Sequence, residues 1–377
     1  MFDTTPHTHQ LQTLGISEET LALQVKRLTD GAQPIQIVRP ATVGDGILRF
    51  DKEQCARLTQ AYDQQKASLR ITRFVPASGM ATRMFKFLYY FLEKYNLTQE
   101  TIRAYLNRKK TYKLGVFIGG IEKLPFYKEL EEELKSLFVD EIDSGTFYYQ
   151  FIKLVLEKYG HKPKALVPFH RYADTTRTAF EEQFRAALTF AVTDNTTHHH
   201  FTITEEHIED FKSIGARIQK SISQQQGVTA LVDYSVQHPN TDTITVDLNN
   251  QPILNENGNL IFRAGGHGAL IANLNQIQGE VIFVSNIDNV PVESRHQEFG
   301  QYKKVLAGCM LDIQKQIFDH LEKLDSGASV TEAKNFLLNQ LQMEIPKLSE
   351  AEERAFIINK LNRPIRVCGM VPNENEP

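Results

Sequence analysis

Four short stretches of the sequence combine residue types that can bind phosphate, a planar base or a divalent metal. The first is "SGMATR", residues 78–83, where small residues precede the hydroxyl of Thr82 and the guanidinium of Arg83. Small residues let a backbone approach a ligand closely, and a guanidinium can grip two phosphate oxygens at once. The alternative is a compact turn in which Ser78 caps a helix and Arg83 is merely solvated.

The second stretch is "PKALVPF", residues 163–169, in which Lys164 lies between Pro163 and a strand-like apolar run. A lysine held on such a stiff approach suits a fixed positive charge, and His170 and Arg171 can add donors near a bound anion. A solvated lysine at a strand edge fits the same pattern, so both interpretations stay open.

The third stretch, "GGHGAL", surrounds His267 with glycines just before a predicted helix. Such a loop offers a surface on which a flat ring can lie against the backbone, although an ordinary tight loop has the same composition. The fourth stretch, "NIDN", follows an apolar strand and supplies Asn286, Asp288 and Asn289. Carboxylate and amide oxygens are ligands that Mg²⁺ accepts, whereas in an ordinary turn they bond their own backbone.

The patterns around these stretches predict the elements that must position them. Residues 1–68 have helical spacing, residues 69–76 are extended, and residues 80–95 are helical again, so "SGMATR" lies at a strand-to-helix turn. Helix amides at such a turn attract anions. Helical spacing also marks an insertion at about 97–160. Further strand candidates are "KALVPF", "HHFTIT", "TALVDYSV", "DTITVDL", "NLIFRA", "EVIFVSN" and, after a long helix from about His296, "RPIRVCGMV".

Strands interleaved with helices predict an α/β fold with a mixed, mainly parallel sheet flanked by helices. The sequence favours a helical N-terminal segment, 1–68, followed by one α/β domain, 69–377, that contains the helical insertion. In such sheets ligands bind outside the carboxyl ends of the strands. All four stretches are expected at these ends.

Composition excludes several classes of protein. The 377 residues carry a net charge of -4, which gives no basic footprint for nucleic acid. Three distant cysteines, Cys55, Cys309 and Cys368, predict neither a disulfide framework nor a zinc cluster. The N-terminus has no secretory pattern, and no apolar run is long enough for a bilayer. These features predict a cytoplasmic protein without nucleic-acid or membrane partners.

In their order, the four stretches resemble those of nucleotide-sugar pyrophosphorylases of the UDP-sugar type. The nucleotidyltransferase fold of those enzymes carries a Gly-Gly-x-Gly-Thr-Arg loop, a Pro-Lys segment, a Gly-rich nucleobase loop and an Asp-Asn pair. The residues of the four stretches, with "NTDTITVD" between them, resemble even more closely those of an uncharacterised bacterial family, a domain of unknown function of the 4301 type. The similarity runs from about Arg73 to the C-terminus, interrupted by the insertion.

The resemblance implies transfer of a nucleotidyl group from a nucleoside triphosphate, with UTP favoured, to a sugar 1-phosphate, with release of pyrophosphate. It implies that Arg83 and Lys164 are catalytic and that Asp288 holds Mg²⁺. The residues implied to contact the nucleotide are Ser78, Gly79, Thr82, Gly265, Gly266, His267, Gly268, Asn286 and Asn289.

Two departures from the enzyme pattern leave other hypotheses open. Ser78 and Ala81 stand where the enzyme loop has glycines, and "RVCGMVPNENEP" resembles a strand and the start of a loop, as if the domain were truncated. One alternative is therefore a nucleotide- or nucleotide-sugar-binding protein of the same fold without turnover. Another is a structural protein that binds a partner through the helical insertion.

Overall fold

A computed structural model describes residues 5–31, 39–109, 111–137 and 143–372. The chain forms two compact units. Unit 1 comprises Met1–Gln33 and Ile71–His296, and unit 2 comprises Pro34–Arg70 and Gln297–Pro377. Each unit is thus built from two stretches that are separate in the sequence.

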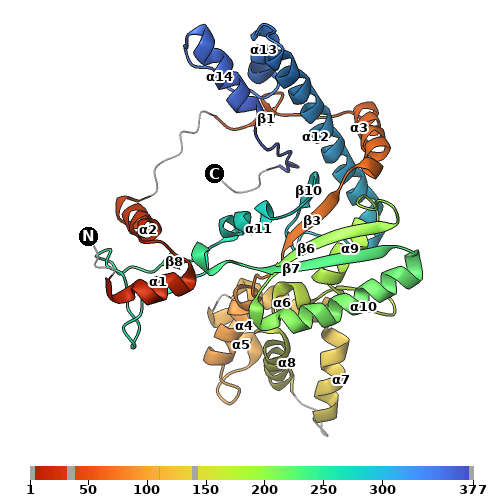
Figure 1. Ribbon diagram of the computed structural model, residues 1–377. Helices are drawn as coiled ribbons and strands as arrows, with labels where there is room; N and C mark the ends of the chain where they lie inside the picture. Colours follow the sequence, from red (N-terminus) through yellow and green to blue (C-terminus); the bar gives the residue numbers. More distant parts are fainter. Residues whose placement is uncertain (1–4, 32–38, 110, 138–142, 373–377) are drawn as a thin grey trace. The chain divides into compact units, whose positions relative to one another are not determined.

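A four-stranded, wholly parallel sheet is the centre of unit 1 (Figure 1). The strand order is β10-β3-β6-β7. The bounds are β3 (Ile71–Pro76), β6 (Thr196–Ile203), β7 (Thr229–Val236) and β10 (Val281–Val284). The predicted α/β class and four of the predicted strands are thereby confirmed.

β3 is the strand from which the chain builds the sheet in both directions. From β3 the chain adds β6 and then β7 on one side, and it returns to place β10 on the other side of β3. The carboxyl ends of β3 and β10 therefore flank a topological switch point, the place at which open sheets of this kind bind their ligands.

Aromatic side chains fix the helix layer on one face of the sheet. In α9 (Ala179–Ala187), Phe180 makes edge-to-face contacts with Phe201 of β6 and with Phe211 of α10 (Ile208–Gln226), at ring-centroid distances of 4.6 and 5.1 Å. The short helix α11 (Ile271–Asn275) lies on the opposite side of the sheet from α10 (Figure 1). The helices α9, α10 and α11 belong to the three successive connections between the four strands.

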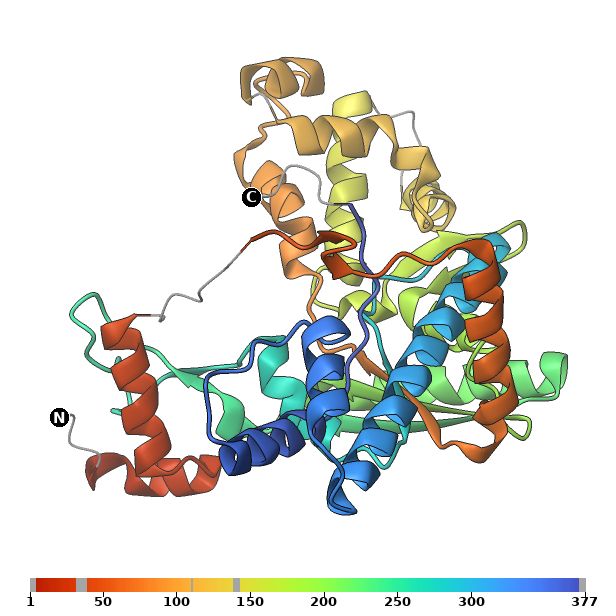
Figure 2. The ribbon, with the colours of Figure 1, turned by 90° about the horizontal axis from the view of Figure 1, so that it is seen from above.

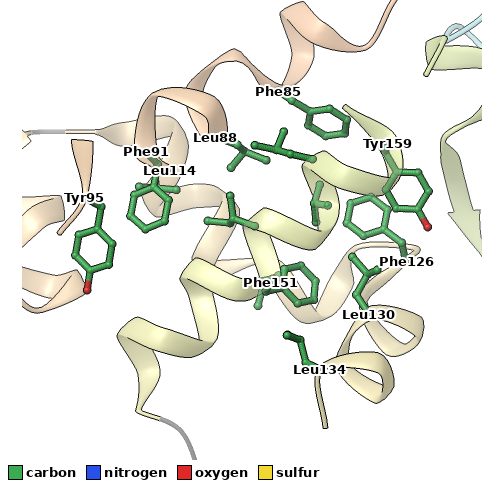
Figure 3. Close-up of a cluster of buried hydrophobic side chains, with 14 of the residues drawn as sticks. Phe85, Leu88, Phe91, Tyr95, Leu114, Phe126, Leu130, Leu134, Phe151 and Tyr159 are labelled. Atoms are coloured by element: carbon green, nitrogen blue, oxygen red, sulfur yellow. The ribbon is translucent and has the colours of Figure 1, made fainter. Parts of the chain in front are cut away.

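In the segment predicted as a helical insertion, about 97–160, the described residues form four helices that pack with the helix after β3. Their common core is rich in aromatic residues, including Phe85, Phe91, Phe126 and Phe151 (Figure 3). The bounds are α4 (Thr82–Lys94), α5 (Ile102–Lys109), α6 (Tyr112–Gly119), α7 (Tyr127–Leu137) and α8 (Ser144–Tyr159).

Several predicted strands do not join the central sheet. In "KALVPF", Lys164–Leu166 forms a 3₁₀ turn (η4), and only β4 (Pro168–Arg171) is extended, paired with β5 (Thr176–Thr178) in a separate hairpin. "DTITVDL" and "NLIFRA" contribute only β8 (Thr243–Ile244) and β9 (Phe262–Arg263), an antiparallel pair. The strand predicted in "RPIRVCGMV" is wrong, because residues 364–371 pair with no strand in the part of the chain that the structure describes.

The remaining helices belong to the ends of the two units. In unit 1, α1 (Thr8–Leu14) and α2 (Glu18–Asp30) pack on the β8 and β9 pair through Leu11 and Leu21. In unit 2, α3 (Lys52–Gln65) lies beside α12 (His296–Asp325), as Figures 1 and 2 both show, through Leu58 and Val305. The other elements are β1 (Thr42–Val43), β2 (Gly46–Ile47), α13 (Thr331–Asn339) and α14 (Glu350–Leu361), with short 3₁₀ turns at Thr5–His7, Lys66–Ser68, Ile121–Lys123, Glu205–His207, Pro239–Thr241, His267–Leu270 and Glu293–Arg295.

Among the residues that the structure describes, no helix combines the length and the apolar content that crossing a bilayer requires.

Candidate functional site

The "SGMATR" stretch forms the turn between β3 and α4. Ala77 donates its N–H to the carbonyl of Thr202 at 2.7 Å, which continues the ladder with β6 for one residue beyond the strand. Helix α4 then begins at Thr82, and its N-cap is Ala81, which has no side-chain capping bond. The alternative in which Ser78 caps the helix is therefore wrong. Thr82 and Arg83 are exposed in the first turn, where helix N–H groups have no intrahelical partner.

The backbone of this turn does not depend on additional glycines. Ala81 has φ -73° and ψ -7°, and neither Ser78 nor Gly79 is among the described residues with positive φ. Ala81 is fully buried in the core of the insertion. Because the observed conformation is open to any L-residue, Ser78 and Ala81 introduce no backbone strain here.

Backbone hydrogen bonds tie the turn to the segment that carries Lys164. Ala81 donates to the carbonyl of Lys162 at 3.0 Å, and the N–H of Lys164 donates to the carbonyl of Gly79 at 2.9 Å. These bonds form an antiparallel bridge between Met80 and Pro163. Two stretches that lie some eighty residues apart in the sequence are thus held as one loop structure.

Lys164 reaches from this structure to the loop that follows β10. Its Nζ lies 3.3 Å from Oδ2 of Asp288, and the two side chains are 34% and 46% exposed. Because an ion pair this exposed contributes only about 0–1 kcal/mol, it can exchange partners at little cost. Three of the four stretches identified in the sequence therefore meet at the switch point between β3 and β10.

The glycine-rich stretch lies beyond the end of β7, at the other edge of the sheet. A Cβ on Gly265 would come within 3.0 Å of the Thr241 carbonyl oxygen, so that this position requires glycine for close packing. Gly266 and Gly268 face open space, and His267 is exposed. The two edge strands, β7 and β10, are three strand spacings apart, roughly 14 Å.

The oxygen ligands after β10 lie on an exposed turn. Asn286, Asp288 and Asn289 are exposed, whereas Ile287 between them is buried. Within the described part of the chain, no three His, Cys, Asp or Glu side chains are grouped so that they could hold a metal ion. A single carboxylate fits Mg²⁺ in the form in which phosphate oxygens and water complete its shell.

A buried carboxylate that the sequence analysis did not single out lies beside this site. Glu182 of α9 is fully buried, and its Oε1 is 3.0 Å from Nδ1 of His170 and also accepts a hydrogen bond from Tyr172. Its Oε2 is 3.5 Å from Nε2 of His296 and 3.8 Å from Nη1 of Arg177. His170 therefore bonds to Glu182, and Arg171 donates to the carbonyl of Glu122 at 2.9 Å, so both have partners other than an anion at the switch point.

The Glu182 network joins the two chain segments that carry Lys164 and Asp288. Tyr172 follows Lys164 along the chain, and its hydroxyl accepts the N–H of Glu293 at 3.1 Å, on the segment that follows Asp288. Arg177 stacks over Tyr172 at 4.3 Å and pairs with Glu293 at 2.9 Å. The sequence has no signal that singles out Glu182, because Glu181 lies between the same two aromatic residues, Phe180 and Phe184.

Changing Glu182→Gln is expected to lower the free energy of unfolding at pH 7 by about 1–3 kcal/mol, the usual cost of an impaired buried charged hydrogen bond. Burial alone raises the pKa of Glu182, but hydrogen bonds from His296, Tyr172 and His170 lower it more, so the pKa lies below its ordinary value. The carboxylate thus stabilises the fold above the unfolded pKa of about 4.3, and this stabilisation is lost as pH falls through the lower folded pKa.

Urea unfolding between pH 7 and pH 3 measures this effect, and the variant should lose less stability on acidification than the parent protein does. Glu209→Gln is the matched control, because Glu209 is 83% exposed and its ion pair with Lys212 lies on the surface of α10. Parallel acid profiles for the parent and Glu182→Gln would contradict the assignment.

Comparisons with known proteins identify a family without a known activity. Neither the curated proteins nor the solved structures gave a match. Residues 4–377 match the family described as "Domain of unknown function (DUF4301)". Because this match covers nearly the whole chain, the protein belongs to the DUF4301 family.

Proposed function

We propose that this protein transfers a nucleotidyl group from a nucleoside triphosphate, with UTP favoured, to a sugar 1-phosphate. The observation that carries the proposal is the meeting of the "SGMATR" turn, Lys164 and Asp288 at the switch point between β3 and β10. Ligands of open parallel sheets bind at such points. The resemblance of the four stretches to UDP-sugar pyrophosphorylases supplies the type of reaction.

The order of the four sheet strands agrees with nucleotide binding. Counted along the chain, the strands lie in the order 3-2-1-4 when read from β7 to β10. This is the order of the first four strands in the doubly wound sheets that bind dinucleotides. The agreement supports a Rossmann-like nucleotidyltransferase fold as part of the proposal.

The turn after β3 offers the groups that a triphosphate requires. Gly79 and the exposed first turn of α4 present backbone N–H groups, Thr82 adds a hydroxyl, and Arg83 adds a guanidinium. Ser78 lies on the same turn, half-buried. Backbone amides at a helix start and a bidentate arginine are well suited to phosphate oxygens.

Lys164 and Asp288 have different roles in this proposal: Asp288 binds the metal ion, and Lys164 supplies a positive charge. Asp288 can hold Mg²⁺, with the amide oxygens of Asn286 and Asn289 nearby in sequence, and the bound ion would neutralise charge on the phosphates. Asp288 is the present partner of Lys164, so occupation of the carboxylate by a metal leaves the ammonium free for a phosphoryl oxygen. Lys164 then stabilises the charge that develops at the α-phosphorus.

The glycine-rich stretch is proposed to hold the base. Gly266, His267 and Gly268 form an open surface beyond β7. A separation of roughly 14 Å between the edge strands is on the scale of an extended nucleoside triphosphate whose phosphates lie at the switch point. Gly265 holds this surface close to the end of β7.

The reaction demands little covalent chemistry from the protein. A phosphate oxygen of the sugar 1-phosphate attacks the α-phosphorus, the bond from that phosphorus to the bridging oxygen of the β-phosphate breaks, and pyrophosphate leaves with the electron pair. Positioning of the two substrates in line and stabilisation of charge supply the rate enhancement. The exposed cations Arg83 and Lys164 fit these two tasks.

We expect UTP with Mg²⁺ to raise the melting temperature of the protein, because a ligand that binds only the native state stabilises it. At a concentration of 100 Kd the gain is about 2.7 kcal/mol. A pyrophosphate-release assay with a panel of sugar 1-phosphates then tests turnover.

A melting shift without pyrophosphate release would favour the alternative, a binding protein of the same fold without turnover. No shift with any of the four nucleoside triphosphates at millimolar concentration would contradict both. A triphosphate analogue with a methylene bridge between the α- and β-phosphorus is the control, because it should stabilise the protein and release no pyrophosphate.

A further inference from the structure

A buried arginine lies beneath the proposed site without an acidic partner. Arg73 of β3 is fully buried, and its guanidinium lies 5.4 Å from the ring centre of Phe190. Burial lowers the pKa of Arg73 to about 9. Among the described residues no carboxylate forms an ion pair with it, and both of its hydrogen bonds go to Gln183, one to the backbone carbonyl and one to Oε1. Arginine side chains are almost never fully buried without a paired charge, so the position of Arg73 is unusual.

Gln183 also contacts the loop that carries Asp288. Its side chain is fully buried on α9, and its Nε2 donates to the carbonyl of Asn286 and to that of Ile287, both at 3.0 Å. The amide can take only this orientation. If it were flipped, its N–H groups would face the Arg73 cation and its oxygen would face two carbonyls.

We infer that Gln183, oriented by Arg73, is the positioning residue that fixes the Asp288 loop against the helix layer. The inference rests on the proposed function for the importance of Asp288 but not for the contacts themselves. Backbone bonds of this loop include those from the N–H of Ser285 to the carbonyl of Phe74 at 3.2 Å and from the N–H of Asn289 to the carbonyl of Asn286 at 3.3 Å. Gln183 adds a buried side-chain link to the two residues directly before Asp288.

This link couples the two sides of the switch point. Arg73 belongs to the strand that leads into the "SGMATR" turn, and Asn286 follows the neighbouring strand. Gln183 therefore links the middle of β3, through Arg73, to the loop that follows β10. A metal-binding carboxylate has to be placed to within a fraction of an ångström, because a misplacement of about 1 Å costs about a hundredfold in rate.

The substitution Gln183→Glu separates positioning from simple stability. Glutamate keeps the shape of glutamine and gives Arg73 a counter-charge, so we expect the melting temperature to stay equal or to rise. The carboxylate cannot donate to the carbonyls of Asn286 and Ile287, and it repels them. Affinity for UTP with Mg²⁺, measured by titration calorimetry, should therefore fall by about tenfold or more.

Amide hydrogen exchange of the full-length protein gives a readout that needs no ligand. In Gln183→Glu, amides at residues 286–290 should exchange about tenfold faster than in the parent, while those of β3 stay protected. Gln219→Glu is the matched control. Gln219 donates to the carbonyl of Ala230 at 2.7 Å from α10, and its replacement should lower stability without affecting the Asp288 loop.

The outcomes distinguish this inference from the proposed function. If the parent does not bind UTP with Mg²⁺, the proposed function fails, and faster exchange of the loop would still support the role of Gln183. Unchanged exchange in Gln183→Glu, or a loss of affinity that follows a loss of melting temperature, would overturn the inference. If Gln183→Glu does not fold, the double variant Arg73→Met/Gln183→Met fills the same space and is tested by the same exchange measurement.

Discussion

Replacing Lys164 by alanine is expected to slow pyrophosphate release by about 10²–10³-fold while weakening the binding of UTP with Mg²⁺ by less than about tenfold. The ammonium is half-exposed and paired with Asp288 before the ligand binds, so the ground-state complex gains little from it. Its full effect arises when charge is redistributed at the transferred phosphorus. Single-turnover rates and titration calorimetry on the same variant measure the two quantities.

The structure makes Lys164→Ala a selective change. Lys164 holds the "SGMATR" turn through its backbone N–H, which alanine retains, so the loop geometry should not change. Lys162→Ala is the control, because the Nζ of Lys162 lies 5.9 Å from the ring centre of Tyr159 rather than beside Asp288. Equal losses in affinity and rate for Lys164→Ala would show that the lysine binds substrate but does not act in the transition state.

Periodicity predicted those parts of the fold that depend on local sequence. The β3 strand, the helix after it and the β6 and β7 strands could be predicted because each has a regular pattern of apolar residues. The rule that ligands bind at the carboxyl ends of parallel strands then placed the "SGMATR" turn and Asp288 at one edge of the sheet.

Strand partners could not be predicted in the same way. "KALVPF" has strand composition, but Pro163 and Pro168 lack N–H donors, and the apolar residues Ala165 and Leu166 are buried in a 3₁₀ turn instead. "RPIRVCGMV" alternates between half-buried and exposed residues without pairing with any described strand. A strand-like sequence pattern indicates a segment that suits a half-buried surface. Whether that segment pairs with another strand depends on which sheet edges the rest of the fold leaves unpaired.

The polar network around the site lay beyond sequence reasoning for a related reason. Glu182 and Gln183 follow each other on one helix and look like exposed polar residues, yet both are fully buried. Their roles follow from partners far away in the sequence, such as His296 for Glu182 and Arg73 for Gln183. Only the assembled layers show that consecutive residues of α9 stabilise the two sides of one site.

Changing Asp288→Asn is expected to abolish the effect of magnesium on nucleotide binding and to strengthen the binding of metal-free UTP. In the parent, the carboxylate of Asp288 pairs with the ammonium of Lys164 at 3.3 Å and also repels the phosphates of UTP. UTP alone should therefore bind weakly, and Mg²⁺ should strengthen its binding. Asparagine removes the negative charge and frees Lys164. UTP without metal should then bind several-fold more tightly than to the parent, in line with about 1 kcal/mol for an exposed pair, and Mg²⁺ should add nothing.

Titration calorimetry with UTP, in the presence of Mg²⁺ or of a chelator, gives the four affinities that this prediction compares. Asp174→Asn serves as the control, because it removes the same charge from the exposed turn between β4 and β5. A variant that keeps the response of the parent to Mg²⁺ would exclude Asp288 as the metal ligand. The variant could instead lose the magnesium response without any gain in affinity for metal-free UTP. In that case the release of Lys164 from Asp288 brings no new contact to the phosphates, and Lys164 does not bind the nucleotide.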